Sequence, residues 1–247
     1  MSIYKHILNS KKNKSKLFAL LVDPDKQDKN DLLILIEKSI IAKVDIFFIG
    51  GSLLMDDKLE DCITTIKSKS NIPVMLFPGN SMQISKKADS ILFLSLISGR
   101  NPHTLIGQQV ISAPLLKQTN LEIISTGYML IDSGEATTAS YMSNTTPIPH
   151  AKHNIATATA IAGEMLGLKL IFLDGGSGAK QAISTKMISS VSSQIDIPLI
   201  VGGGIRSAEK AIENCAAGAD VIVVGNAIEK ENGLIAEIAK AIHNFWF

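Results

Sequence analysis

The chain has 247 residues, of which 46% are hydrophobic, and its 24 Lys and Arg residues against 23 Asp and Glu residues leave a formal charge of +1. This length suits one large domain or two small ones, with enough apolar residues for a sizeable core, and the balanced charge argues against nucleic-acid binding or a strongly acidic partner. No apolar run approaches the roughly 20 residues that span a bilayer, so any membrane contact would be peripheral. The two cysteines lie far apart and the Lys-rich start does not read as a signal peptide, so we expect a cytoplasmic protein.

Short apolar runs alternate with amphipathic segments along the chain. The runs predict the buried strands of a parallel sheet, at Leu17–Val22, Val44–Ile49, Ile72–Phe77, Ser90–Leu94, Leu121–Ser125, Leu168–Leu173, Ile197–Val201 and Val221–Val224. The segments between them predict helices, at Asp31–Ala42, Asp57–Lys67, Thr104–Lys117, Ile155–Leu166, Lys180–Val191, Ala208–Ala217 and Gly233–His243. Between the third and fourth strands, Ser81–Lys87 is too short to be a convincing helix.

Eight strand-and-helix cycles in this length predict an α/β fold with a single (β/α)8 TIM-type barrel over residues 1–247. An open, doubly wound sheet is the alternative, and it would usually carry a glycine-rich fingerprint after its first strand. Here the first strand ends in Asp23-Pro24-Asp25-Lys26, and the glycine-rich strand ends come late in the chain. Phosphate sites after the last strands are frequent in barrels, so we favour the barrel.

Three late strand ends carry glycines, at Asp174–Gly178, Gly202–Gly204 and Gly225-Asn226. Glycine lets the backbone approach a ligand closely, and a helix pattern follows each end, so the three together predict a phosphate pocket. Arg206 and Lys180 follow two of these loops, and we expect them to be solvated residues of the first helical turns rather than phosphate ligands. The segment of residues 131–150 is long for a loop, which is typical of a functional lid or a disordered stretch.

Two early strand ends carry oxygen donors. The Asp23 carboxylate and the Ser52 hydroxyl would suit Mg²⁺, which commonly takes one or two protein oxygens together with phosphate oxygens and water. The other interpretation of Asp23 is a turn and helix cap. Asp174, at the sixth strand end, reads either as a general base for a substrate hydroxyl or as a loop carboxylate that accepts backbone N–H groups.

Taken in order, these motifs resemble the geranylgeranylglyceryl phosphate synthase family, which includes the related bacterial heptaprenylglyceryl phosphate synthases. The segment Ser95–Pro102 looks like the branch called group II. The resemblance covers most of the chain and rests on the strand-end sequences LVDPDK (21–26), GGS (50–52), GEMLG (163–167), LDGGSGA (173–179), VGGGIR (201–206) and VGN (224–226).

The resemblance implies a modified barrel and a Mg²⁺-dependent prenyltransferase that acts as a homo-oligomer. In such an enzyme the C3 hydroxyl of sn-glycerol 1-phosphate attacks C1 of a polyprenyl diphosphate, here expected to be geranylgeranyl diphosphate, and diphosphate leaves. Carried over by motif, Asp23 and Ser52 would hold Mg²⁺ and Asp174 would be catalytic. Tyr128 is the second catalytic candidate, as a neighbouring hydroxyl rather than a motif residue. The residues that would bind sn-glycerol 1-phosphate are Phe172, Leu173, Asp174, Gly175, Gly176, Ser177, Gly178, Gly203, Gly204, Gly225 and Asn226.

This chain departs from the family pattern just before the first glycines, where many relatives carry Tyr-Leu-Glu and this chain has Phe172-Leu173-Asp174. The tyrosine hydroxyl is absent and the carboxylate is one methylene shorter, and Tyr128 is the nearby hydroxyl that would compensate. The departure motivates two alternatives: a phosphate-ligand-binding barrel with reduced or lost catalysis, or another phosphate-sugar barrel enzyme.

An apolar groove is needed for the prenyl tail, and its candidate residues are Met82, Ile84, Met129 and Tyr141. The aromatic C-terminal tail, Phe245-Trp246-Phe247, is expected to pack on the core or on a subunit interface.

Overall fold

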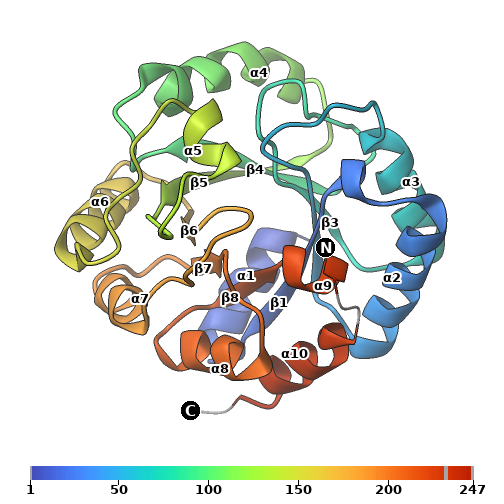
Figure 1. Ribbon diagram of the computed structural model, residues 1–247. Helices are drawn as coiled ribbons and strands as arrows, with labels where there is room; N and C mark the ends of the chain where they lie inside the picture. The colour runs from blue at the N-terminus through green and yellow to red at the C-terminus, as the bar shows by residue number, and fades with distance from the viewer. Residues whose placement is uncertain (1, 231–232, 246–247) are drawn as a thin grey trace.

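The computed structural model describes residues 2–230 and 233–245, and it shows a closed barrel of eight parallel strands in sequence order. Helices surround the barrel, as Figure 1 shows in a view down its axis. The predicted fold is therefore confirmed. The strands are β1 (Leu17–Val22), β2 (Ile46–Ile49), β3 (Val74–Leu76), β4 (Ser90–Leu96), β5 (Glu122–Leu130), β6 (Leu170–Asp174), β7 (Leu199–Gly202) and β8 (Val221–Val224).

All seven predicted helices are present with shifted ends, and three further helices (α1, α5 and α9) were not predicted from the sequence. The α-helices are α1 (Ile3–Lys12), α2 (Lys29–Ala42), α3 (Leu59–Lys69), α4 (Gln108–Leu116), α5 (Thr138–Met142), α6 (His153–Met165), α7 (Thr185–Ser192), α8 (Ala208–Ala216), α9 (Asn226–Lys230) and α10 (Leu234–His243). A 3₁₀ turn, η1 (Pro24–Lys26), follows β1, and a π-helical turn, η2 (His103–Gly107), precedes α4. As expected, Ser81–Lys87 forms no helix.

Among the predicted ends that differ from the structure, two have identifiable physical reasons. The helix predicted from Lys180 begins at Thr185, because the Ser184 side chain caps it by accepting a hydrogen bond from the N–H of Met187 at 3.2 Å. β5 continues past the predicted end at Ser125 through Gly127, which reads as a turn in the sequence. A Cβ at this position would lie only 2.9 Å from the Ile171 side chain, so the glycine serves close packing inside the strand.

Strand residues alternate between two buried clusters, as period-two geometry requires. One set fills the barrel interior, including Phe48, Leu92 and Phe172, and the other packs outward against the helices. Of the aromatic tail, Phe245 packs against the outer cluster, and residues 246 and 247 lie outside the described residues.

The floor of the barrel is closed by the N-terminal helix α1. Its Ile3 and Ile7 are buried in the same cluster as the inward-facing strand residues. Glu122, at the start of β5, accepts hydrogen bonds from the Ser2 hydroxyl at 2.5 Å and from the Ile3 N–H at 2.6 Å. A carboxylate at a helix N-terminus stabilises the helix electrostatically, so Glu122 fixes α1 to the barrel.

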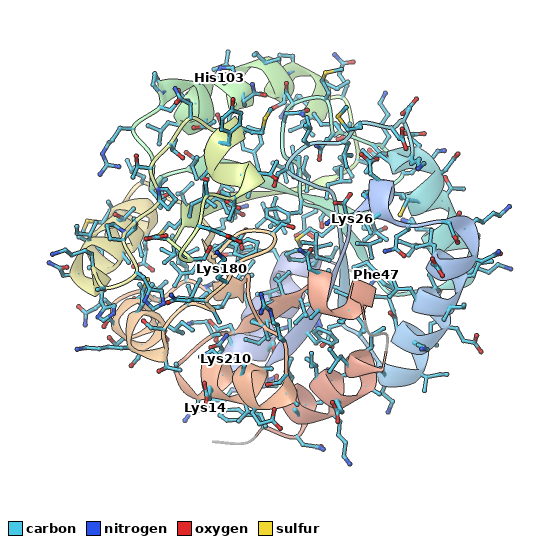
Figure 2. All side chains as sticks on the ribbon, in the orientation of Figure 1. Lys14, Lys26, Phe47, His103, Lys180 and Lys210 are labelled. Carbon is cyan, nitrogen blue, oxygen red and sulfur yellow. The ribbon has the colours of Figure 1, made fainter. Side chains whose placement is uncertain are left out.

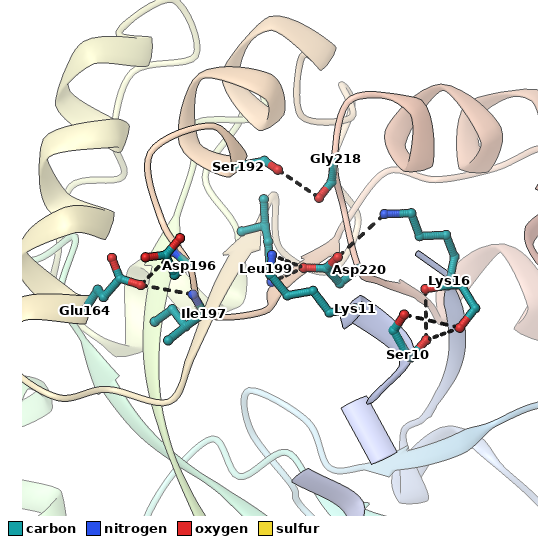
Figure 3. Close-up of polar contacts among 11 residues, drawn as sticks. Ser10, Lys11, Lys16, Glu164, Ser192, Asp196, Ile197, Leu199, Gly218 and Asp220 are labelled. Atoms are coloured by element: carbon teal, nitrogen blue, oxygen red, sulfur yellow. Dashed lines mark hydrogen bonds and ion pairs between the residues drawn. The ribbon is translucent and has the colours of Figure 1, made fainter. Parts of the chain in front are cut away.

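A buried carboxylate, Asp220, ties the floor together beside α1. It accepts the N–H of Leu199 at the start of β7 and pairs with Lys11 of α1, both at 3.0 Å. The ammonium group of Lys16, also buried, lies 3.6 Å from its second oxygen. Figure 3 shows these contacts around Asp220. Helix α1, β7 and β8 are therefore linked through one side chain.

Replacing Asp220 by Ala should lower the free energy of unfolding by about 3–5 kcal/mol, because it leaves a buried lysine without this carboxylate. The measurement is urea unfolding followed by circular dichroism. The matched control is Glu213→Ala, which removes an exposed carboxylate that pairs with Lys210 at 2.9 Å. That variant should stay within about 1 kcal/mol of the wild type. Similar unfolding free energies for the two variants would contradict the role given to Asp220.

Candidate active site

A cavity of about 520 Å³ opens at the carboxyl ends of the strands. Glycine occupies the last inward-facing position on three strands, and all three line the cavity: Gly50 after β2, Gly202 in β7 and Gly225 after β8. On β1 and β6 the corresponding positions are Asp23 and Asp174, and both carboxylates line the cavity. These glycines let neighbouring parts of the barrel approach closely, since a Cβ at Gly50 would lie 2.1 Å from the Phe77 carbonyl oxygen. Two carboxylates face the cavity from different strands.

Asp174 is held by two hydrogen bonds. The Tyr128 hydroxyl donates to its Oδ2 at 2.6 Å, and the N–H of Gly176 donates to its Oδ1 at 2.8 Å. The tyrosine ring is itself fixed, since it packs edge-on against Phe77 and Phe172 with ring centroids 5.7 and 5.6 Å apart. Asp174 is only 8% exposed and lines the cavity. The cavity wall therefore carries a carboxylate that is held in place and largely shielded from water.

Burial dominates the protonation of this pair. It raises the pKa of Asp174 above its ordinary value, although the hydrogen bonds from Tyr128 and Gly176 act in the opposite direction. Burial, together with the neighbouring Asp174 charge, raises the pKa of Tyr128 well above that of a free phenol. The tyrosine is therefore the donor and the aspartate the acceptor. A carboxylate with a raised pKa is a better proton acceptor, as a general base requires.

The late glycine loops come together beside Asp174. Gly203 has φ +84°, and a Cβ there would lie 2.6 Å from the N of Gly175 and 2.9 Å from Asp174 Oδ1, so only glycine fits between the loops. Asn226 begins α9 and donates a hydrogen bond to the Ser177 hydroxyl at 2.9 Å, which joins the loops after β6 and β8. A short helix at this position is typical of phosphate sites in barrels.

The early strand ends place oxygen donors beside the loop after β8, since β1 pairs with β8. Asp23 lines the cavity, accepts the N–H of Asp25 at 3.2 Å and pairs with Lys26 at 3.2 Å. The loop after β2 approaches the Asp23 carboxylate closely, since a Cβ at Gly51 would lie 3.3 Å from it, and Ser52 follows on the same cavity wall. Asp23 therefore caps the turn that follows β1 and lines the cavity at the same time.

The donor set at this end fits a Mg²⁺ ion better than a transition metal. In the part of the chain that the structure describes, no three His, Cys, Asp or Glu side chains gather into a metal site. One carboxylate and one hydroxyl, Asp23 and Ser52, are hard oxygen donors that leave most coordination positions to phosphate oxygens and water, as Mg²⁺ sites commonly do.

The barrel wall is split between β3 and β4, and the cavity continues through the split. β3 pairs with β4 only at Met75–Ser90 and Leu76–Ile91, whereas β4 pairs with β5 over seven positions. The next residue, Phe77, still donates to the Ile49 carbonyl after its pairing with β4 has ended, at 2.9 Å, and Pro78 has no N–H to extend the ladder. Since Ser81–Lys87 forms no helix, a groove runs from the mouth to α4. It is lined by Ile84, Ile91, Phe93, Gln109, Ser112 and Leu116.

The structure brings most of the predicted site residues to one cavity. Its wall includes Asp23, Ser52, Tyr128, Phe172, Asp174, Gly176, Ser177, Gly178, Gly203, Gly204, Gly225 and Asn226. Two predicted acceptor-binding residues are not on the wall. The Leu173 side chain is buried in the outer cluster, since strand residues alternate, and Gly175 lies behind the loop, where its N–H donates to the Gly202 carbonyl at 3.1 Å.

Other sequence expectations need correction. Of the four groove candidates only Ile84 lines the cavity, because Met129 is buried in the outer cluster and Met82 and Tyr141 point to solvent, 88% and 83% exposed. Neither Lys180 nor Arg206 is in a helix. Lys180 lies off the cavity wall and pairs with Glu135 at 2.7 Å. Arg206 lines the cavity and donates to the Ala179 carbonyl at 2.7 Å.

The predicted lid contains a helix that sequence reasoning missed. α5 covers part of the mouth, with Thr138, Ala139 and Met142 on the cavity wall. Its sequence signal is short: Thr137 and Ser140 form a capping box, in which each side chain accepts the other's backbone N–H, at 3.0 and 3.3 Å.

Among the described residues, no helix has the length and apolarity to cross a bilayer.

The sequence matches the PcrB family over residues 9–243. A protein of Chitinophaga pinensis named geranylgeranylglyceryl phosphate synthase is 56% identical over 241 residues, which cover 98% of this chain and 96% of the relative. One of the same name from Spirosoma linguale is 51% identical over 230 residues, 93% of this chain and 92% of the relative. The crystal structure of (S)-3-O-geranylgeranylglyceryl phosphate synthase from Thermoplasma acidophilum, in complex with sn-glycerol-1-phosphate, is similar with a TM-score of 0.93 at 30% identity, covering 99% of this chain and all 100% of that one.

Proposed function

The chain belongs to the PcrB family, and on that premise we propose that it is a prenyltransferase that joins sn-glycerol 1-phosphate to a polyprenyl diphosphate, with geranylgeranyl diphosphate as the expected donor. The observation that carries the proposal is that one cavity contains a glycine-lined end, a buried carboxylate, an oxygen-donor end and an apolar side groove. The acceptor needs a phosphate site and a proton acceptor, and the donor needs a diphosphate site and an apolar groove. This one cavity contains all four.

The acceptor, sn-glycerol 1-phosphate, is assigned to the late strands. Its phosphate would lie against the loops that Gly203 and Gly176 allow, near Ser177 and Asn226, and its glycerol would extend toward Asp174. From there the C3 hydroxyl donates its proton to the Asp174 carboxylate as its oxygen bonds to C1 of the donor. Tyr128 holds the carboxylate in place during this transfer, so it acts as a positioning residue. The shorter side chain of Asp174 is thus supported from the neighbouring strand.

The donor's diphosphate is assigned to the early strands. Asp23 and Ser52 would hold Mg²⁺ there, and the ion when bound would neutralise charge on the leaving diphosphate. As the new C–O bond forms, the bond between C1 and the diphosphate breaks and the diphosphate leaves with the electron pair. The surrounding protein positions the allylic carbon and keeps water away from it.

The prenyl tail is assigned to the split wall. It would pass between β3 and β4 and lie along α4, whose nine residues span about 13 Å at 1.5 Å per residue. Most of this groove is apolar, and Leu116 and Ile91 bound its lower part. Two polar residues, Gln109 and Ser112, also line it, and the amide of Gln109 donates to the Thr104 carbonyl at 3.1 Å.

A donor series with sn-glycerol 1-phosphate and Mg²⁺ tests the proposal. Farnesyl, geranylgeranyl and heptaprenyl diphosphates are each supplied, and product masses are read by mass spectrometry. We expect ether-linked product, with most turnover on geranylgeranyl diphosphate, and no product when Mg²⁺ is chelated. Absence of product with every donor would refute the prenyltransferase and favour the binding-only alternative if sn-glycerol 1-phosphate still binds.

A groove variant shows whether the tail follows α4. Ser112→Phe fills the groove while leaving the polar cavity unchanged, so it should shift the preferred donor to farnesyl diphosphate and lower geranylgeranyl turnover by about 10-fold or more. Ile111→Phe is the matched control, since Ile111 lies one residue away and is 61% exposed. An unchanged donor preference in Ser112→Phe would place the tail elsewhere.

A further inference from the structure

Two Lys or Arg side chains line the cavity within the described residues, and they differ in what they do. Arg206 is bound to the Ala179 carbonyl at 2.7 Å and so supports the glycine loop after β6. Lys26 stands on the other side, on η1, where its ammonium group lies 3.2 Å from Asp23 Oδ2 and 3.5 Å from Asn226 Oδ1. Lys26 therefore contacts both ends of the cavity.

Lys26 belongs to a polar chain that crosses the mouth. It links Asp23 to Asn226, and Asn226 is hydrogen-bonded in turn to Ser177 at 2.9 Å. Figure 2 shows Lys26 close to the start of α9. Its side chain is 42% exposed, against 17% for Asp23, so the flexible lysine stem has room to move while the carboxylate stays in place.

The charges of the proposed reaction require such a movement. Without ligand, the Lys26 ammonium neutralises Asp23, which is the carboxylate assigned to the metal. A divalent ion on Asp23 would repel the ammonium, and the diphosphate that arrives with the metal carries more negative charge than one Mg²⁺ neutralises. The incoming diphosphate therefore offers the displaced ammonium a charge-assisted hydrogen bond.

We propose that Lys26 is a catalytic residue that pairs with Asp23 in the empty enzyme and transfers to the donor's diphosphate when metal and donor bind. The proposal rests on the proposed function. When the bond between C1 and the diphosphate breaks, the electron pair goes to the diphosphate oxygen, and Lys26 stabilises that charge by donating a hydrogen bond. The proton stays on Lys26, and the acceptor's proton still goes to Asp174.

The proposal predicts two binding changes of opposite sign in Lys26→Met. Mg²⁺ alone should bind about 2- to 5-fold more tightly, because no ammonium competes for Asp23. Inorganic diphosphate in the presence of saturating Mg²⁺ should bind about 10- to 100-fold more weakly, because a charge-assisted hydrogen bond is lost. sn-Glycerol 1-phosphate should bind within about 3-fold of wild type. All three are measured by isothermal titration calorimetry.

Two further variants make the result interpretable. Lys26→Arg keeps the charge and should recover most of the diphosphate affinity. Lys87→Met is the matched control, because Lys87 has a similar exposure (48%) and pairs with Glu60 at 2.9 Å away from the cavity; it should change none of the three affinities. Circular dichroism and a thermal melt confirm that each variant is folded.

Three outcomes would overturn the proposal: unchanged diphosphate affinity in Lys26→Met, weaker Mg²⁺ binding in that variant, or a loss of sn-glycerol 1-phosphate affinity as large as the loss for diphosphate. The last would assign Lys26 to the acceptor's phosphate. Since binding requires no turnover, a wild-type protein that binds diphosphate yet forms no ether product would refute the proposed function while leaving Lys26 to be judged by the titrations.

Discussion

Substitution of Asp174 by Asn is expected to lower kcat by about 10²- to 10⁴-fold, the range that a general base contributes. Asparagine keeps the shape of aspartate and its one oxygen still accepts a hydrogen bond, but its amide nitrogen accepts none and it takes up no proton. Since the interactions with phosphate lie in the glycine loops, the affinity for sn-glycerol 1-phosphate should change little. Steady-state kinetics and a titration with the acceptor measure the two quantities separately. A kcat within about tenfold of wild type would show that another group takes the proton.

The pH profile of the wild type supplies a second check. Burial raises the pKa of Asp174, so the acidic limb of the rate profile should lie above the range of an ordinary carboxyl group. In Tyr128→Phe the hydrogen bond that favours the ionised carboxylate is lost, so the pKa of Asp174 rises further and the acidic limb moves to higher pH. At alkaline pH, where Asp174 is ionised in both proteins, the two rates should converge apart from any loss of positioning. A limb that moves to lower pH would contradict the arrangement seen here.

Substitution of Asp23 by Asn is expected to remove most of the Mg²⁺-dependent activity. Loss of a residue that only supports a metal ligand lowers metal affinity or activity by roughly 10- to 100-fold. Loss of the only carboxylate assigned to the ion should lower the activity by at least as much. The rate is measured against Mg²⁺ concentration, and the variant should need far more Mg²⁺ for half-maximal activity. Chelation of the metal in the wild type should produce a comparable loss.

Two controls separate metal binding from other effects of charge. Ser52→Ala removes a neutral donor from the same site, so we expect a smaller rise in the Mg²⁺ requirement. Asp56→Asn removes a carboxylate that is 53% exposed and pairs with Lys58, and it should behave as the wild type does. An Asp23→Asn variant with an unchanged Mg²⁺ dependence would move the ion to another site.

Most of the barrel could be predicted from the sequence because its strands are buried on both faces and therefore read as continuous apolar runs. The prediction failed where a residue type has two uses. Gly127 reads as a turn, yet it permits close packing within β5, and Lys180 reads as a helical residue, yet Ser184 starts the helix later. These choices depend on neighbours such as Ile171, which lie far away in the sequence.

The site, like the barrel, could be predicted from the sequence only in part. Strand-end motifs placed Asp23, Ser52 and Asp174 at one face, because parallel strands of a barrel all end on the same side. The side groove was not predictable, because it depends on where β3 stops pairing with β4, and a sequence does not show register. The bond between Tyr128 and Asp174 was anticipated only as a compensation. Its geometry follows from the pairing of β5 with β6, which sets Tyr128 opposite Phe172, two residues before the aspartate.

The closure of the barrel floor by α1 has a consequence for the order of folding. The helix precedes every strand of the barrel in the sequence, but Glu122, which binds its N-terminus, lies 120 residues from Ser2, and Asp220 lies 209 residues from Lys11. Contacts between such distant residues form late, because a long loop must first be closed. An isolated helix of ten residues is marginal in water, so α1 has to wait without stable structure until β5 and β8 exist. The helix that precedes all eight strands in the sequence is therefore among the last elements to become ordered.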